Sequence, residues 1–334
     1  MPERHRVRAS PTVKDGTVYI GSGWGEPRDG TIHAIDATDG TAQWTVNLDR
    51  TVFSSAIAVG DELFVGTNDN LYALDPTDGS ELWQYGTDQS FGYSSPTVVD
   101  GVLYIGGYDQ NLKAVDVSDG TELWTFETGR TIHSSPTVLD DTVYFGSGDG
   151  NVYAVDTAGN EVWTFEAGEY VWSSPTIVGE RVFVGSIFDD VEKEGKIYAL
   201  HAGDGTIAWE FEPDNTVRSS PVVVDGIVYV GSDDGNLYAL DAGVEGSSDG
   251  SRVNHGTLGH HHTWAGGKTS DEDDRRDESP TVADYADADG VVRADGLQNG
   301  FNDWAAGEIS GTVLQSVFNA WQSGEPVGTT TTSF

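Results

Sequence analysis

The chain contains no cysteine, which excludes disulfide bonds, thiol chemistry and zinc–thiolate sites. Basic residues are also scarce: 17 Lys and Arg stand against 55 Asp and Glu, which gives a net charge of −38 at pH 7. A charge of this size repels nucleic acids and anionic lipid, so we exclude both as partners. No apolar run reaches the roughly 18 residues that a membrane-spanning helix needs.

The acidic residues are spread along the whole chain of 334 residues rather than gathered in one tail. Such a surface stays hydrated and soluble when salt screens its self-repulsion, so the composition favours an origin in an extreme halophile over an ordinary acidic surface. The segment MPERHRVRASPTV lacks the apolar core of a signal peptide. We therefore expect either a cytoplasmic protein or a chain whose leader lies upstream of this sequence.

A repeat of about 40 residues dominates the first 240 positions. Each copy opens on a phrase such as SSPTVVDG, continues with an aromatic strand that ends on glycine, and closes on a phrase such as AVDVSDGTELW. The six copies begin at Ala9, Ser54, Ser94, Ser134, Ser173 and Ser219. Four short strands per period, separated by turn residues, predict an all-β fold: a β-propeller of about six four-stranded blades.

The copy that begins at Ser94 shows the expected strands most clearly. They cover residues 95–99, 102–107, 111–116 and 121–126, with Asp and Gly between them. Asp-Gly pairs accept positive φ, so the sequence predicts tight two-residue hairpin turns, including one between the third and fourth strands. In the sixth copy, residues 252–258 are the expected outer strand.

Tryptophan recurs at one position of the repeat, where we expect it to pack between neighbouring blades. The five residues are Trp44, Trp83, Trp124, Trp163 and Trp209. The pattern A-x-D-x-x-D-G-x-x-x-W resembles the tryptophan-docking motif of PQQ-type propeller repeats, and the resemblance covers residues 9 to about 264. The fourth copy is one residue shorter, the fifth has His201 in place of the aspartate, and the sixth lacks the tryptophan.

The resemblance implies one of two functions. The family includes quinoprotein alcohol dehydrogenases, which hold PQQ beside Ca²⁺ and often carry a vicinal disulfide, and also non-catalytic propellers of the outer-membrane assembly type. This chain has no cysteine, and its aspartates are mostly accounted for by turns and by the docking motif. Propellers of this family more often have seven or eight blades, so further blades upstream are expected if the ring is incomplete.

The residue before each SSP phrase varies between copies while keeping one place in the repeat. These six residues are Arg8, Phe53, Tyr93, His133, Trp172 and Arg218. Each lies where the outer strand of one blade crosses to the inner strand of the next, and in a propeller that crossing approaches the rim of the central channel. The sequence therefore predicts a ring of aromatic and cationic side chains, suited to a flat or anionic ligand. The alternative is a rim filled for packing alone.

Residues after the repeats predict different structure. Four histidines, His255, His260, His261 and His262, are candidate transition-metal ligands or part of a polar loop. Residues 265–283 are highly charged and predict a disordered linker. Residues 284–325 contain two related segments with Leu, Phe and Trp at helical spacing, which predict a small helical pair, and residues 326–334 form a tail.

The loop before the first of these helices is acidic. Asp287, Asp289 and Gly290 match three positions of an EF-hand loop, with Asp284 and Asp295 near its two ends, so these aspartates are candidate Ca²⁺ ligands. The doubled loop–helix plan resembles dockerin modules, although the interior of the loop is shifted by one residue. The alternative is an acidic helix start that the helix dipole favours.

We therefore predict a non-catalytic propeller that binds a protein partner, or a small anionic or aromatic ligand, at the channel rim. The family resemblance implies an extracellular or cell-surface location. The alternative is a PQQ-dependent quinoprotein oxidoreductase.

Overall fold

A computed structural model describes residues 7, 9–23, 30–48, 50–86, 91–188 and 195–248. Within these ranges the chain forms β-strands and turns, with no α-helix and hence no helix long and apolar enough to cross a membrane. The strands form antiparallel sheets in which each strand pairs with its neighbour in sequence. The all-β prediction is confirmed for this part of the chain.

Five sheets have four strands and the sixth has three described strands. The first two sheets comprise β1 (Thr12–Lys14), β2 (Thr17–Gly23), β3 (Gly30–Asp36), β4 (Ala42–Leu48), β5 (Ile57–Val59), β6 (Glu62–Gly66), β7 (Asn70–Leu74) and β8 (Glu81–Gly86). The third and fourth comprise β9 (Thr97–Val99), β10 (Val102–Gly106), β11 (Asn111–Asp116), β12 (Glu122–Glu127), β13 (Thr137–Leu139), β14 (Thr142–Gly146), β15 (Asn151–Asp156) and β16 (Glu161–Glu166). The last two comprise β17 (Thr176–Val178), β18 (Arg181–Gly185), β19 (Ile197–His201), β20 (Ile207–Phe211), β21 (Val222–Val224), β22 (Ile227–Gly231) and β23 (Leu237–Asp241).

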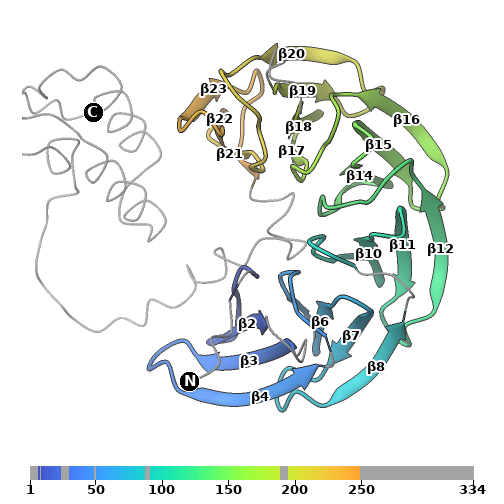
Figure 1. Ribbon diagram of the computed structural model, residues 1–334, viewed down its shortest axis with the longest axis vertical. Helices are drawn as coiled ribbons and strands as arrows, with labels where there is room; N and C mark the ends of the chain where they lie inside the picture. Colours follow the sequence, from blue (N-terminus) through green and yellow to red (C-terminus); the bar gives the residue numbers. More distant parts are fainter. Residues whose placement is uncertain are drawn as a thin grey trace, which may run out of the picture. The chain divides into compact units, whose positions relative to one another are not determined.

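The sheets follow one another around a common centre, with the first strand of each innermost and the fourth strands on the outside (Figure 1). Neighbouring first strands contact each other, for example β13 with β9 and with β17. This is the arrangement of propeller blades.

A ladder of serines joins the innermost strands. The second serine of each SSP phrase donates its backbone N–H to the Oγ of its counterpart in the next sheet, at 2.9–3.0 Å. The ladder runs through Ser10, Ser55, Ser95, Ser135, Ser174 and Ser220. The first serine holds its own sheet instead: Ser94 Oγ accepts the N–H of Gly106 at 3.0 Å. The SSP phrase thus provides hydrogen bonds both within and between blades.

The apolar core lies between successive sheets. In the third and fourth sheets, the second and third strands are buried along almost their whole length because a neighbouring sheet covers each face. The outer strands alternate instead: in β12, Trp124 and Phe126 turn inward while Glu122 and Thr125 are exposed. A continuous apolar run thus indicates a strand covered on both faces, and alternation indicates a strand covered on one.

Each repeated tryptophan is hydrogen-bonded to the following sheet. Its indole Nε1–H donates to a backbone carbonyl there, from 2.7 Å for Trp83 with Val117 to 3.3 Å for Trp209 with Ala242. The first four tryptophan rings also lie against a glycine of the next sheet. The ring–glycine pairs are Trp44 with Gly79, Trp83 with Gly120, Trp124 with Gly159 and Trp163 with Gly205. These glycines have positive φ, and a Cβ at any of them would meet the ring at 3.0 Å or less.

The turns differ in one respect from the expectation. The first turn of a blade is the predicted two-residue hairpin, with Asp100 and Gly101 at positive φ between paired Val99 and Val102. The turn after the third strand is longer. Asp116 pairs its backbone with Thr121, and its carboxylate accepts the N–H of Ser118 at 2.8 Å. Four residues therefore lie in the loop between Asp116 and Thr121, and the Asp116 carboxylate caps this loop by accepting the N–H of Ser118.

The sixth sheet is less buried than the others: all of β23 is partly or fully exposed, and Val222 is 37% exposed. The expected outer strand at 252–258 lies outside the described residues. The same holds for the four histidines, the linker, the helical pair and the calcium loop at Asp284, Asp287, Asp289 and Asp295. Blade number, ring closure and the domain boundaries remain predictions.

Candidate binding rim

The predicted rim residues lie in the segments that link one sheet to the next. Five of them are described, namely Phe53, Tyr93, His133, Trp172 and Arg218, whereas Arg8 lies outside the described residues. Each precedes a serine whose Oγ is fixed by the glycine at the end of the following second strand, as in Ser173 with Gly185 at 3.1 Å. The serine contacts therefore hold these links in equivalent positions around the centre.

The five side chains form one continuous row. The ring centroids of Phe53 and Tyr93 are 5.1 Å apart, those of Tyr93 and His133 5.6 Å, and those of His133 and Trp172 5.3 Å. At the end of the row, the guanidinium carbon of Arg218 lies 5.6 Å from the Trp172 ring centre. Residues about 40 positions apart in sequence thus become direct neighbours.

The orientation of the rings determines what the row offers. His133 is nearly parallel to both neighbours, with interplanar angles of 23° to Tyr93 and 20° to Trp172. Stacked rings cover each other's negative faces and leave their positive edges and N–H or O–H groups outward. The row therefore presents edges and donors rather than open faces.

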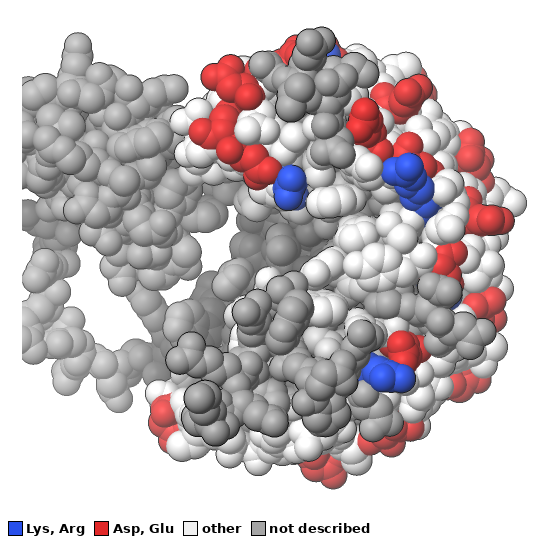
Figure 2. Space-filling view, viewed as in Figure 1, with Lys and Arg blue, Asp and Glu red and all other residues white. Residues whose placement is uncertain are grey.

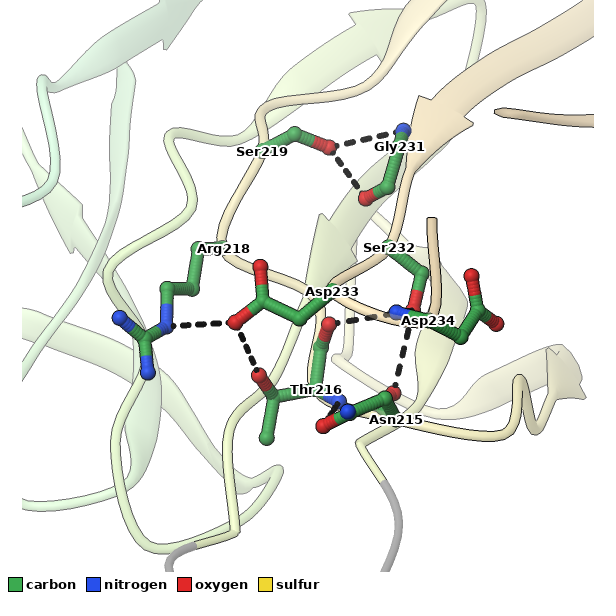
Figure 3. A network of polar contacts seen from close by, with 8 residues as sticks. All are labelled: Asn215, Thr216, Arg218, Ser219, Gly231, Ser232, Asp233 and Asp234. Carbon is green, nitrogen blue, oxygen red and sulfur yellow. Dashed lines mark hydrogen bonds and ion pairs between the residues drawn. The ribbon is translucent and has the colours of Figure 1, made fainter. Parts of the chain in front are cut away.

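Arg218 is anchored from one side. Its Nε donates to Asp233 at 3.0 Å, and Thr216 Oγ1 donates to the same carboxylate oxygen at 3.0 Å. Figure 3 shows the two terminal nitrogens of Arg218 turned away from Asp233, with the Ser219–Gly231 contact in the upper part of the view. The arginine is thus positioned by one carboxylate while its terminal donors stay available, since half of the side chain is exposed.

A pocket of about 230 Å³ opens beside the row. It is built from the turns and links of the third to fifth sheets, all at the same end of the blades. Its lining residues are Gln110, Arg130, Thr131, His133, Gly148, Tyr170 and Trp172. Arg130 lies 5.5 Å from the Tyr170 ring centre, and Tyr170 in turn packs on Trp172 at 5.7 Å.

Burial favours the uncharged forms of two titratable rings beside the pocket, those of His133 and Tyr108. Burial lowers the pKa of His133 below its ordinary value of 6.5. Burial also raises the pKa of Tyr108, whose ring meets His133 edge-on at 5.0 Å. His133 makes ring contacts only within the described residues, so no carboxylate there orients it as a general base. The positive charge of the pocket comes from Arg130.

Charge is distributed unevenly over the surface. Figure 2 shows acidic side chains mostly along the outer margin of the viewed face, whereas the part nearer the centre is largely uncharged with isolated cations. Across the described residues, no three His, Asp or Glu side chains are grouped as metal ligands would be.

Sequence reasoning did not single out Arg130, Tyr170 or Gln110. A signal for Tyr170 is present, because the position two residues before the rim residue is threonine at Thr51, Thr131 and Thr216 but aromatic at Phe91 and Tyr170. Signals for the other two are weaker: Arg130, like Arg50, stands three residues before a rim residue, and Gln110 replaces the positive-φ glycine found at Gly150 and Gly235.

The chain matches one protein family by sequence and is similar to solved structures. The family model of the outer membrane protein assembly factor BamB matches residues 3–95, 28–166 and 148–248. The crystal structure of BamB from Moraxella catarrhalis is similar with a TM-score of 0.56 and 25% identity, over 72% of this chain and 78% of that one. The computationally designed protein Ika8 shares the fold with a TM-score of 0.61 and 18% identity, over 70% of each chain. Among curated proteins, none matches the chain by sequence.

Proposed function

Because the chain belongs to the family of the outer membrane protein assembly factor BamB, we propose that it is a non-catalytic binding propeller that holds a protein partner at its rim. The term assembly factor in the family name describes action on other proteins. The propeller fold alone does not imply this role, so the proposal depends on the site.

The observation that carries the proposal is the continuous row from Phe53 to Arg218. Fixed repeat positions stabilise the blades, whereas this position changes its side chain in every described copy and still brings all five into contact. Tyr93 remains 43% exposed within the row. Aromatic residues and arginine that stay accessible on a soluble fold are typical of protein-binding sites.

A PQQ-dependent oxidoreductase is the second candidate, favoured by the resemblance of the repeats and by the aromatic lining of the pocket. A pocket of about 230 Å³ is small for such a cofactor, since ligand sites usually measure roughly 300–1,000 Å³. Adding PQQ and Ca²⁺ and then following quinone absorbance and dye reduction tests this candidate directly. The appearance of both signals would establish the enzyme.

An extracellular or cell-surface location, a halophilic source and a calcium-binding dockerin-like module belong to the same proposal. The acidic composition and the family resemblance support the first two. The third depends on Asp284, Asp287, Asp289 and Asp295, and calorimetry of the full chain with Ca²⁺ at high salt tests it.

Photo-crosslinking tests the proposed function. A crosslinking residue at Gln110, which is exposed at the pocket, should capture a partner in the native cells, and Trp172→Ala should abolish that product. The matched control is Thr125 in the same sheet, exposed on the outer strand β12. Equal capture at both positions, or capture only at Thr125, would contradict a binding site at the rim.

A further inference from the structure

We propose that the group bound at this rim is a carboxylate, seated in the pocket between Arg130 and Trp172. The inference rests on the proposed function and adds the chemistry of the bound group. Three features support it: within the described residues one arginine has no polar partner and one indole N–H has no acceptor, and the pocket is small.

Arg130 is unusual among the described cations. The others each have a polar partner, as in Lys14 with Gly60, Arg50 with Asp69, Lys113 with Asp109, Arg181 with His201, Lys196 with Glu210 and Arg218 with Asp233. The guanidinium of Arg130 has only the Tyr170 ring within the described part of the chain. In a protein with 55 acidic residues, an exposed arginine that meets no carboxylate leaves five donors free for a ligand.

The nearby carboxylate of Asp149 does not supply this partner. It follows pocket residue Gly148 and accepts hydrogen bonds from the N–H of Gly129 at 2.7 Å, the N–H of Asn151 at 3.0 Å and the O–H of Tyr153 at 2.8 Å. These contacts orient Asp149 toward its own turn and strand, so Arg130 keeps its charge for the pocket.

Trp172 supplies a second unused donor. The indole N–H of each repeated tryptophan reaches a backbone carbonyl, but that of Trp172 has no acceptor among the described residues. Its ring stacks on His133 and lies 5.6 Å from the guanidinium carbon of Arg218. A ligand can thus engage Trp172 through its edge and N–H, which favours an acceptor over a flat ring.

Carboxylate satisfies these donors better than other common groups. It is planar, carries full negative charge at neutral pH and accepts bidentate hydrogen bonds from a guanidinium. A volume of about 230 Å³ suits one side chain or one small acid rather than a large cofactor. The sources are the acidic side chain or chain end of a protein partner, and a free organic acid.

Defined probes separate these sources. We would titrate the full chain with 3-phenylpropionate and its amide, and with the peptide acetyl-Glu-Phe-Glu-amide and its Gln-Phe-Gln counterpart. Tryptophan fluorescence and the NMR signals of the His133 ring report binding. Each acid should bind at least about tenfold more tightly than its uncharged counterpart, a difference of about 1.4 kcal/mol. A tighter peptide indicates a protein source, and equal affinities indicate a free acid.

Arg130→Gln should remove this preference for the acid, because the exposed side chain contributes charge without supporting the fold. The matched control is Arg181→Gln, which removes a cation that bonds to His201 at the other end of a blade. Equal binding of acid and amide, absence of binding by all four probes, or an unchanged preference in Arg130→Gln would overturn the inference. A crosslinked product at Gln110 would still indicate a binding site at the rim in that case. The two experiments therefore distinguish a wrong ligand chemistry from a wrong binding site.

Discussion

Trp163 and Trp172 lie close together in sequence and serve opposite parts of the molecule. Trp163 is 7% exposed, donates its N–H to Ala202 O at 2.8 Å and lies on Gly205 of the next sheet. Trp172 is partly exposed, stacks on His133 and keeps its N–H unused among the described residues. At the constant repeat position the indole N–H has an acceptor in the next sheet, whereas at the variable position it has none within the described residues.

The same contrast extends to the neighbours of each tryptophan. Around Trp163, glycine, carbonyl and apolar core come from the repeat and recur in every inner blade. Around Trp172, histidine and tyrosine each occur at their repeat position in one copy only, as His133 and Tyr170, and Arg218 occupies a position whose side chain changes in every described copy. Substitutions in the first environment should therefore act on stability, and substitutions in the second should act on binding.

The largest expected effect is on stability at the docking position. Trp163→Ala removes a buried ring and leaves the Ala202 carbonyl without its donor, which should lower the free energy of unfolding by about 3–5 kcal/mol. Trp172→Ala loses only a stacked, partly exposed pair and should cost about 1 kcal/mol. Urea denaturation followed by circular dichroism at fixed salt measures both. Equal losses would erase the distinction between the two environments.

A glycine pair sharpens the comparison without touching a tryptophan. Gly205 and Gly235 both have positive φ, at 70° and 88°, so alanine at either position costs about 1 kcal/mol in backbone strain. Only at Gly205 does the new Cβ meet a ring, 2.7 Å from Cε3 of Trp163, while nothing lies within 4 Å at Gly235. Gly205→Ala should therefore lose about 1–3 kcal/mol more than Gly235→Ala in the same denaturation experiment. Similar losses would show that the ring does not need the glycine.

The sequence was sufficient to predict the blades and the neighbourhood of the rim residues. Both follow from the repeat, because side chains at one position of successive blades must become neighbours once the sheets surround one centre. Phe53, Tyr93, His133 and Trp172 are adjacent in the structure for that reason.

The details that decide the chemistry were beyond the sequence. Whether neighbouring rings stack or expose their faces depends on side-chain rotamers, which the repeat does not specify. The pocket also needs Arg130 and Gln110, whose positions depend on the paths of a link and a turn. The four-residue loop after β11 was missed because Asp-Gly alone predicts a two-residue turn, and the capping contact from Asp116 to Ser118 decides the length.

The smallest expected effect is on the pH dependence of stability, to which the surroundings of Trp172 contribute through His133. Burial lowers the pKa of His133, so the unfolded chain binds a proton more readily than the folded one. The contribution of this residue to stability is thus fully present above about pH 6.5 and is lost as pH falls toward the lowered pKa. Tyr93, Tyr108, Trp172 and, at the pocket, Arg130 surround the ring, and none of them offsets an imidazolium charge.

His133→Phe keeps the stacked row and removes this titration. Between pH 8 and pH 5.5 the free energy of unfolding of the unmodified protein should fall more steeply than that of the variant, because the carboxylates common to both cancel in the difference. Trp163→Ala leaves His133 in place, so this variant should keep the steeper slope of the unmodified protein. A His133→Phe variant with an unchanged slope would mean that His133 is no harder to protonate in the folded rim than in the unfolded chain, and the row would then be more open to water than its stacking implies.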